Sequence, residues 1–126
     1  LDQDGNLIDA CGIAAITALL TAKMRVYDSE GNPTDTVEPL PVRKIPVPCT
    51  FAKIAGSLMT DPQVDEESVL DSRLTVTTDD EGYIVAMQKG EYGSFKLEEI
   101  MEAVKISKSE GARIREIIKA AVNESD

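Results

Sequence analysis

The chain contains no histidine and no tryptophan, and its 126 residues include only three Tyr, two Phe and two Cys. Without histidine, the chain by itself cannot form a Ser-His-Asp or Cys-His catalytic arrangement or a histidine metal site. So few aromatic rings cannot form a ladder on which successive nucleic-acid bases stack. The composition therefore excludes the commonest hydrolase sites and the aromatic type of nucleic-acid platform.

The charge of the chain is strongly negative, since 23 Asp and Glu residues outweigh 13 Lys and Arg residues and leave a formal net charge of −10. A compact domain with this charge is repelled by nucleic-acid phosphates and by anionic membranes. If the protein acts on nucleic acid, other surfaces must therefore supply the positive charge. The balance of 42% hydrophobic and 29% charged residues is that of a globular domain.

The two cysteines, Cys11 and Cys49, lie far apart in apolar stretches and form no CxxC pair. We expect both to be buried, reduced thiols of a cytoplasmic protein, and a single disulfide is the alternative. The longest apolar run begins after Asp9, lacks a basic flank and is too short to cross a bilayer, so we expect no signal peptide and no membrane partner. Because the chain begins with Leu, we also expect it to be part of a longer protein.

An apolar helix is predicted at the start of the chain, from about Leu7 to about Lys23. Asn6 is placed to cap it, and Asp9 lies near the positive end of its dipole. Residues 8–20 are apolar nearly all round the helix, a pattern typical of a helix buried on most sides. A domain of this size seldom buries its first helix so fully. We therefore expect an upstream half or a partner to cover it.

The middle of the chain is predicted to form two short strands followed by an extended connector. Residues 25–38 predict strand, turn and strand, with the turn at 28–33. Residues 39–48 hold four prolines, so this segment must be extended and is not expected to form a central strand. We interpret it as a rigid connector between two halves, and a proline-rich ligand is the less favoured alternative.

The remainder predicts a sheet covered by a helix. Strands are expected at 48–55, 57–60, 69–78 and 83–88, with a hairpin turn at 79–82. The final helix starts near Leu97, and Gly111 marks either a tight crossing over the sheet or a break. The predicted fold is α/β (α+β) with two layers, a four-stranded, mostly antiparallel sheet packed by a long C-terminal helix. One face of that helix carries Leu97, Ile100, Met101, Val104, Ser107, Gly111, Ile114, Ile118 and Ala121.

Three groups of residues are candidates for a functional site. The run 2–6 hints at a calcium loop, but Gly5 comes too early and position 12 of the loop would be Ile13, so a turn explains it better. The acidic residues of 61–71 could bind Mg²⁺ or shift a pKa, although a solvated loop is commoner. The basic residues are scattered and favour ordinary surface charge; they are Arg43, Lys44, Lys53, Arg73 and Lys89.

Several stretches resemble the ribonuclease PH family. The resemblance rests on 4–15, on 39–48 and on shorter matches at 51–54, 61–62, 66–71 and 84–90. It covers almost the whole chain in order. Within the family, the chain is most similar to the non-catalytic ring subunit of the archaeal exosome.

The resemblance implies a domain organisation and an assembly. Residues 1–24 would be the C-terminal end of a first subdomain, 25–44 an extended linker and 45–123 an RNase PH C-terminal-type subdomain of a protein about twice as long. The family degrades RNA from its 3′ end with inorganic phosphate. The implied partners are a catalytic RNase PH-like subunit alternating with this one in a hexameric ring, RNA passing through the ring, and RNA-binding cap subunits.

The resemblance also bears on catalysis. Catalytic relatives hold two aspartates on the loop matching 61–71, where the nearest counterparts are Glu67 and Asp71. The loop is shorter and one aspartate has become glutamate, and misplacing a carboxylate by about 1 Å can cost about 100-fold in rate. The serine and arginine that cradle phosphate have no match.

We therefore predict no catalytic, cofactor or metal residue in this chain. Phosphate, and Mg²⁺ if used, would act in the partner's site, and the RNA-binding residues stay unidentified. The alternatives are an active phosphorolytic enzyme of the same family and a generic acidic α/β interaction domain.

Overall fold

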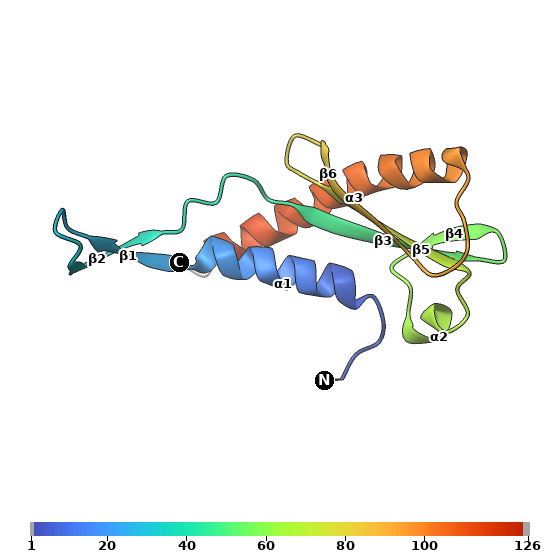
Figure 1. Cartoon of the computed structure of the whole chain (residues 1–126), viewed down its shortest axis with the longest axis horizontal. Helices are drawn as coiled ribbons and strands as arrows, with labels where there is room; N and C mark the ends of the chain where they lie inside the picture. Colours follow the sequence, from blue (N-terminus) through green and yellow to red (C-terminus); the bar gives the residue numbers. More distant parts are fainter. Residues whose placement is uncertain (1, 125–126) are drawn as a thin grey trace.

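A computed structural model describes residues 2–124, and Figure 1 shows a sheet-and-helix body from which a hairpin projects at one end. The helices are α1 (Leu7–Thr21), α2 (Val64–Glu67) and α3 (Leu97–Asn123). The strands are β1 (Lys23–Tyr27), β2 (Pro33–Pro39), β3 (Val47–Ile54), β4 (Ser57–Thr60), β5 (Ser72–Thr78) and β6 (Ile84–Gly90).

The body is a four-stranded antiparallel sheet of order β4-β3-β5-β6, as predicted. Helix α3 packs across the two central strands, β3 and β5, while α1 packs against β3 and α3. The fold is therefore the predicted sheet with a long C-terminal helix. Strand β6 lies at one edge, and its residues 84–89 are all exposed.

The core forms where the sheet meets α3. Leu74 and Val76 alternate with polar positions along β5, and they pack with Cys49 and Phe51 of β3 and Ala103 of α3. A second cluster joins three elements through Ile16 of α1, Val47 of β3 and Ile118 of α3. These contacts fix the first helix to the sheet that follows it by some thirty residues in the chain.

The proline-rich segment departs from the prediction at its end. The strand expected at 48–55 is β3, which begins one residue earlier, at Val47. It is a central strand, although the segment 39–48, which contains Pro48, was not expected to form one. The exception arises because β4 pairs only with residues 51–54, so on that side the start of β3 has no strand partner. Pro48 instead contacts α1, where a Cβ added to Gly12 would lie 2.6 Å from its Cγ.

Helix α3 is continuous through Gly111, which confirms the tight crossing and not the break. A Cβ at Gly111 would lie 2.5 Å from Thr78 Oγ1 of β5. The predicted face is confirmed at Ser107, Gly111 and Ile118, but it is wrong at Leu97 and Met101, which are 74% and 60% exposed. The side chains that face the sheet repeat mostly at four-residue steps and include a buried arginine; they are Ala103, Ser107, Gly111, Arg115 and Ile118.

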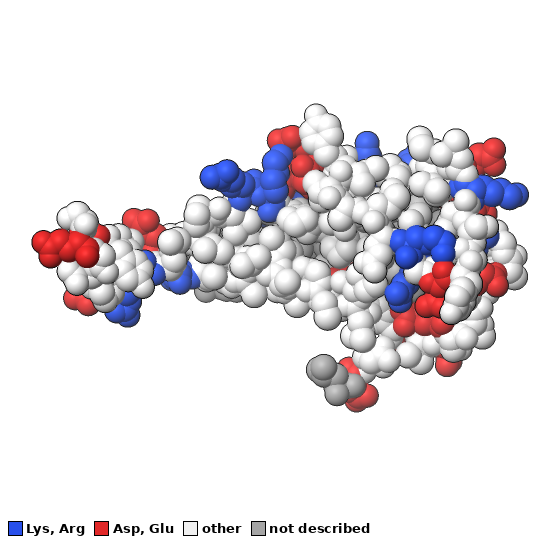
Figure 2. Space-filling view, viewed as in Figure 1, with Lys and Arg blue, Asp and Glu red and all other residues white. Residues whose placement is uncertain are grey.

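The opening helix is buried on one face only within this chain, and the predicted cover by an upstream half or a partner stays a prediction. Ile16 is its only buried residue, and Leu7 and Leu19 are about half exposed. Figure 2 shows a largely uncharged surface in this part of the molecule. Asn6 is the N-cap residue of α1, as predicted, but it adopts a left-handed conformation (φ 47°) and its side chain makes no cap bond. The chain itself covers one face of α1.

The cysteine prediction holds for Cys49 only. Cys49 is buried, whereas Cys11 is exposed on α1, and both thiols are free. Burial is the main reason that the pKa of Cys49 rises to about 11. Cys11 escapes burial because only one side of its helix packs on the body.

The two thiols should react very differently with a maleimide reagent. At pH 7.5 we expect one label per native chain, at Cys11, and a second only when urea exposes Cys49, because a buried thiol with a raised pKa supplies almost no thiolate. Mass spectrometry of the labelled chain checks this, with Cys11→Ser as the control. Rapid double labelling of the native chain would contradict the packing of Cys49.

The segment after α1 forms the predicted strand, turn and strand. Strands β1 and β2 pair antiparallel around a turn in which Asp28 Oδ1 accepts hydrogen bonds from the backbone N–H of Glu30 and Asn32. These bonds lower the pKa of Asp28, the backbone bond from Asn32 most of all. Among residues 2–124, no helix is both long and apolar enough to span a membrane.

Candidate functional site

The polar residues of the candidate site meet where α1 begins. Asn6 is 8% exposed, and its side-chain Nδ2 donates to Asp9 Oδ2 at 3.0 Å and to Asp61 Oδ1 at 2.7 Å. Its backbone N–H donates to Glu67 Oε1 at 3.0 Å. One asparagine therefore joins the start of α1 to the acidic loop some sixty residues further along the chain.

Asp9 ties the same helix to the sheet. Its Oδ2 accepts from the backbone N–H of Thr50 at 2.8 Å, and its Oδ1 accepts from the Thr50 hydroxyl at 2.7 Å. The Thr50 hydroxyl also lies 2.9 Å from the Thr75 hydroxyl in β5. Asp9 thus supplies the hydrogen-bond acceptor for Thr50, a residue of β3 that has no pairing partner in β4. Both carboxylate oxygens of Asp9 accept hydrogen bonds.

A cavity of about 460 Å³ opens beside this network. Three carboxylates and one guanidinium line it, together with apolar and sulfur groups from β3, α1 and α3. The charge of Asp9 adds to burial in raising the pKa of Cys49, which lies in the same wall. The lining residues are Asn6, Asp9, Ile13, Cys49, Thr60, Asp61, Glu110, Arg113 and Ile114.

The acidic loop predicted as a candidate site contains the short helix α2, and several of its carboxylates accept hydrogen bonds from the chain itself. Asp61 accepts from Asn6, and Glu66 Oε2 accepts from the backbone N–H of Gln63 in a capping box. These carboxylates hold the loop in shape. Asp61 and Glu67 both accept from Asn6, whereas Glu66 bonds back to the start of its own helix.

Glu67 and Asp71, the counterparts of the catalytic aspartates, also accept hydrogen bonds from the chain's own backbone. Glu67 Oε1 accepts from Asn6 N–H, as described above, and Asp71 Oδ2 accepts from Ala55 N–H at 3.0 Å. Ala55 lies in the β3–β4 turn with φ 48°, so Asp71 stabilises a strained turn. Glu67 lies in α2 and Asp71 in the loop before β5, so the two carboxylates hold different parts of the chain.

The residues present do not fit a protein-held divalent cation. Within residues 2–124, no three Asp, Glu, Cys or His side chains come together in a way that could hold a metal ion. Mg²⁺ is usually held by one or two carboxylates and by oxygens of a bound phosphate.

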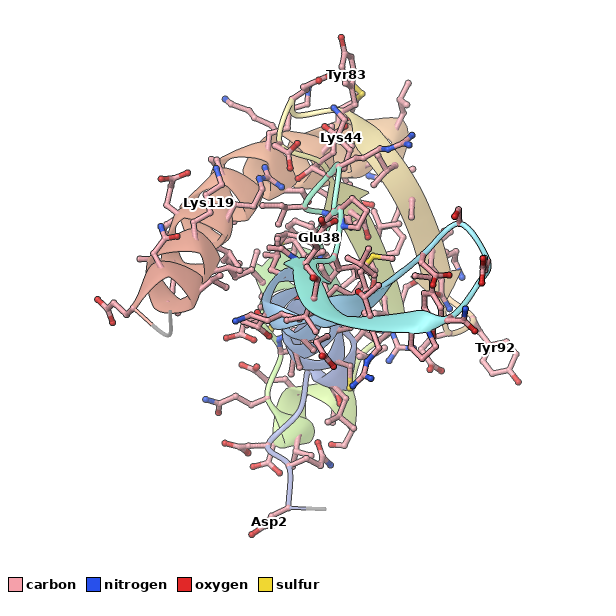
Figure 3. All side chains as sticks on the ribbon, turned by 90° about the vertical axis from the view of Figure 1, so that its left-hand side faces the viewer. Asp2, Glu38, Lys44, Tyr83, Tyr92 and Lys119 are labelled. Atoms are coloured by element: carbon pink, nitrogen blue, oxygen red, sulfur yellow. The ribbon has the colours of Figure 1, made fainter. Side chains whose placement is uncertain are left out.

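Two of the five scattered basic residues, Lys44 and Lys53, are paired with carboxylates. Lys53 Nζ lies 2.7 Å from Glu99 Oε1 and 5.7 Å from the centre of the Phe95 ring, and its hydrogen bond is the main cause of the lowered pKa of Glu99. Lys44 pairs with Glu81 and Asp79 beside the turn that carries Tyr83 (Figure 3). The hydrogen bond from Lys44 to Glu81 is the largest cause of the raised pKa of Lys44. This arrangement fits the surface-charge interpretation.

Sequence reasoning missed the joining role of Asn6 and Asp9. The three-residue spacing between them, immediately after Asp4-Gly5, was visible, but it was interpreted as a helix cap. The long-range partners Thr50 and Asp61 could not be inferred, because their approach depends on how α1 docks on β3.

Comparison with known families and proteins gives a consistent result. A family model described as "3' exoribonuclease family, domain 2" matches residues 44–110. The exosome complex component Rrp42 of Thermococcus onnurineus is 53% identical over 127 residues, which cover 97% of this chain and 47% of that protein. Its counterpart in Pyrococcus horikoshii is 52% identical over 130 residues, with 99% and 47% covered. The chain spans about half the length of these relatives.

Solved structures agree. A chain described as "Archaeal exosome core" superposes with a TM-score of 0.83 at 36% identity, covering 94% of this chain and 47% of that one. A chain of an Archaeoglobus fulgidus exosome "with RNA bound to the active site" gives a TM-score of 0.81 at 35% identity, covering 92% and 44%. The sheet and helix described above are therefore those of a known architecture.

Proposed function

Because this chain belongs to the 3′ exoribonuclease family, whose second domain it contains, we propose that it is a structural subunit of a phosphorolytic 3′-to-5′ exoribonuclease ring. Its role would be to dock beside a catalytic RNase PH-like subunit, to order that subunit's site and to form part of the RNA path. Relatives named as exosome components and solved exosome cores support this assignment. The proposed partners are the catalytic ring subunit, RNA and RNA-binding cap subunits.

We further propose that this subunit is not itself catalytic. The main support for this proposal is that Glu67 and Asp71 each accept a hydrogen bond from a backbone N–H group of their own chain. A carboxylate that holds a strained turn or a helix start is fixed away from a shared reacting point. Catalysis by two carboxylates requires both to be aimed at one substrate.

Charge supports the same division of roles. A net charge of −10 disfavours RNA binding by this chain alone. The basic side chains Lys44 and Lys53 are paired with carboxylates. The positive charge along an RNA path would then come from the partner subunit or from the rest of the protein.

Replacement of the two counterpart carboxylates tests the proposal. In a ring reconstituted with the catalytic subunit, Glu67→Gln and Asp71→Asn should each leave phosphate-dependent RNA degradation within about threefold of wild type, whereas losing a true acid–base group costs about 10²–10⁴-fold. Release of nucleoside diphosphates from a 3′-labelled RNA measures the rate. The same aspartate-to-asparagine changes in the catalytic subunit are the positive control.

A second experiment measures RNA degradation by this subunit in the absence of the catalytic subunit. We expect no phosphate-dependent degradation above a no-protein blank. Robust degradation by this subunit alone, abolished by Asp71→Asn, would overturn the non-catalytic assignment and favour the active enzyme. Failure to assemble with any RNase PH-like subunit would overturn the ring assignment.

A further inference from the structure

The edge strand β6 carries apolar side chains on the face of the sheet that α3 occupies. Ile84 and Met87 are each almost half exposed, and they pair with Thr78 and Val76 of β5. Both of these β5 residues face α3, because Thr78 Oγ1 donates to the carbonyl oxygen of Ser107 and Val76 packs in the core with α3. Residues directly opposite each other in an antiparallel pair point to the same face. Ile84 and Met87 therefore lie beside α3, which packs on β3 and β5.

The side of α3 that looks toward β6 is apolar as well. Ile100 lines a second cavity of about 460 Å³ together with Met87, whereas Glu110, on the other side of the helix, lines the cavity beside α1. Leu97 and Met101 are mostly exposed and lie on the same side as Ile100, since residues three or four apart share one side of a helix. The surface between the strand and the helix is called the edge trough. Its residues are Ile84, Met87 and Lys89 of β6, and Leu97, Ile100, Met101, Val104 and Lys108 of α3.

The spacing of helices on a sheet leaves room for one more helix over β6. A helix with its side chains is about 10 Å across and neighbouring strands lie about 4.8 Å apart, so one helix covers about two strands. Helix α3 covers β3 and β5, and a second helix with its axis about 8–10 Å away would cover β6. A strand added to the outer edge of β6 would extend the sheet but leave Met87 and Met101 in solvent. The trough therefore fits a helix better than a strand.

The charges of the trough select the ends of that helix. Lys89 lies at one end, opposite Leu74, and Lys108 lies near the other, next to the residue that Thr78 contacts. Neither lysine forms an ion pair within residues 2–124. In a chain with a net charge of −10, two unpaired cations beside an apolar strip favour a segment that carries carboxylates. The exposed Leu97 and Met101 side chains between them suit an apolar helix face and offer no contact to a phosphate backbone.

We propose that the edge trough binds an amphipathic helix of a partner protein. The apolar face of this helix covers Ile84, Met87 and Met101, and acidic residues near its two ends pair with Lys89 and Lys108. The stretch of α3 from Leu97 to Lys108 rises about 16 Å, so about three turns of the partner helix match it. The proposal does not depend on the ring assignment, because it rests on the surface of this chain alone.

Selection from a displayed library of random peptides about 16 residues long tests the proposal on the 126-residue chain. We expect the enriched peptides to share apolar residues at i, i+3 or i+4, and i+7, with Asp or Glu near both ends. The strongest of them is then synthesised. Titration should shift the NMR signals of the Met87 and Met101 methyl groups and raise the helical circular dichroism of the peptide.

A matched pair of variants locates the binding. Met101→Glu places a negative charge in the trough and should weaken binding of the synthesised peptide about tenfold or more. Ile117→Glu makes the same kind of change at an exposed apolar residue on the other side of α3, and should leave the affinity nearly unchanged. Lys108→Glu should also weaken binding. Exchanging the acidic residues at one end of the peptide for Lys should then restore it, which only a direct charge pair explains.

Five results would overturn the proposal. Equal losses in Met101→Glu and Ile117→Glu would place the peptide elsewhere. Enriched peptides with apolar residues at every second position would indicate a strand on the edge of β6. Shifts of the Met87 and Met101 methyl groups with protein concentration alone would indicate a second copy of the chain. Shifts caused by an RNA oligonucleotide, with no helical peptide enriched, would indicate a nucleic-acid surface, and enrichment of no peptide at all would leave the trough without the proposed partner.

Discussion

Replacing Asp9 with alanine should destabilise the chain by about 3–5 kcal/mol, because it removes one carboxylate from three hydrogen bonds at once. The backbone N–H of Thr50, which is 1% exposed, would lose its acceptor, and the Thr50 hydroxyl and the Asn6 amide would each lose one of two partners. Urea unfolding followed by circular dichroism measures the change in the free energy of unfolding. Hydrogen exchange should show α1 opening before the sheet.

The isosteric change Asp9→Asn separates hydrogen bonding from charge. The asparagine oxygen can accept the backbone bond from Thr50, and its NH₂ can donate to the Thr50 hydroxyl, which then turns its hydrogen toward Thr75. We therefore expect a loss below about 1.5 kcal/mol. Asp35→Ala on the exposed hairpin is the control and should change stability by less than about 0.5 kcal/mol. A small effect of Asp9→Ala would refute the anchoring role.

Replacing Gly111 with valine should cost about 3 kcal/mol, since the new side chain has no space where α3 crosses β5. Its Cβ would lie 2.5 Å from Thr78 Oγ1 and 3.3 Å from both terminal nitrogens of Arg115. Arg115 is 3% exposed and donates to the carbonyl oxygen of Thr78 at 2.8 Å, so it cannot move aside cheaply. The same urea experiment gives the magnitude.

A neighbouring position provides the matched control. Ala112→Val lies one residue further along α3 on the exposed side, so it reports the lower helix propensity of valine alone, about 0.5 kcal/mol. Combining Gly111→Val with Thr78→Ala should recover part of the loss, as expected for two residues in contact. Equal costs for the valine changes at 111 and 112 would contradict the close crossing.

The fold was largely predictable because its elements carry strong local patterns. The alternation of Leu74 and Val76 with threonines fixed β5, and the turn at 79–82 fixed the hairpin to β6. The start of β3 was harder, because proline normally marks a segment outside a central strand, and Pro48 is accommodated only where a helix replaces the neighbouring strand. The buried face of α3 was misjudged because Leu97 and Met101 fit the apolar spacing while a buried arginine, Arg115, does not.

The candidate site was less predictable, because its bonds join residues far apart in the chain. Glu67 and Asp71 were identified by resemblance, but their backbone partners Asn6 and Ala55 follow from tertiary packing. Asn6 itself fits a helix cap so well by sequence that its long-range role was hidden. Local rules describe what a residue does to its own helix, and they do not describe which distant loop that helix meets.

The β1–β2 hairpin offers room for evolutionary change. Its extensive contacts are between its own two strands, and a Cβ at Gly31 in its turn would meet no atom within 4 Å. It stands apart from the body that α1, the sheet and α3 build together (Figure 1). Lengthening or exchanging this tip would therefore leave folding of the body intact, which makes it a natural place for lineages to acquire new decoration and for an experimenter to insert an affinity tag.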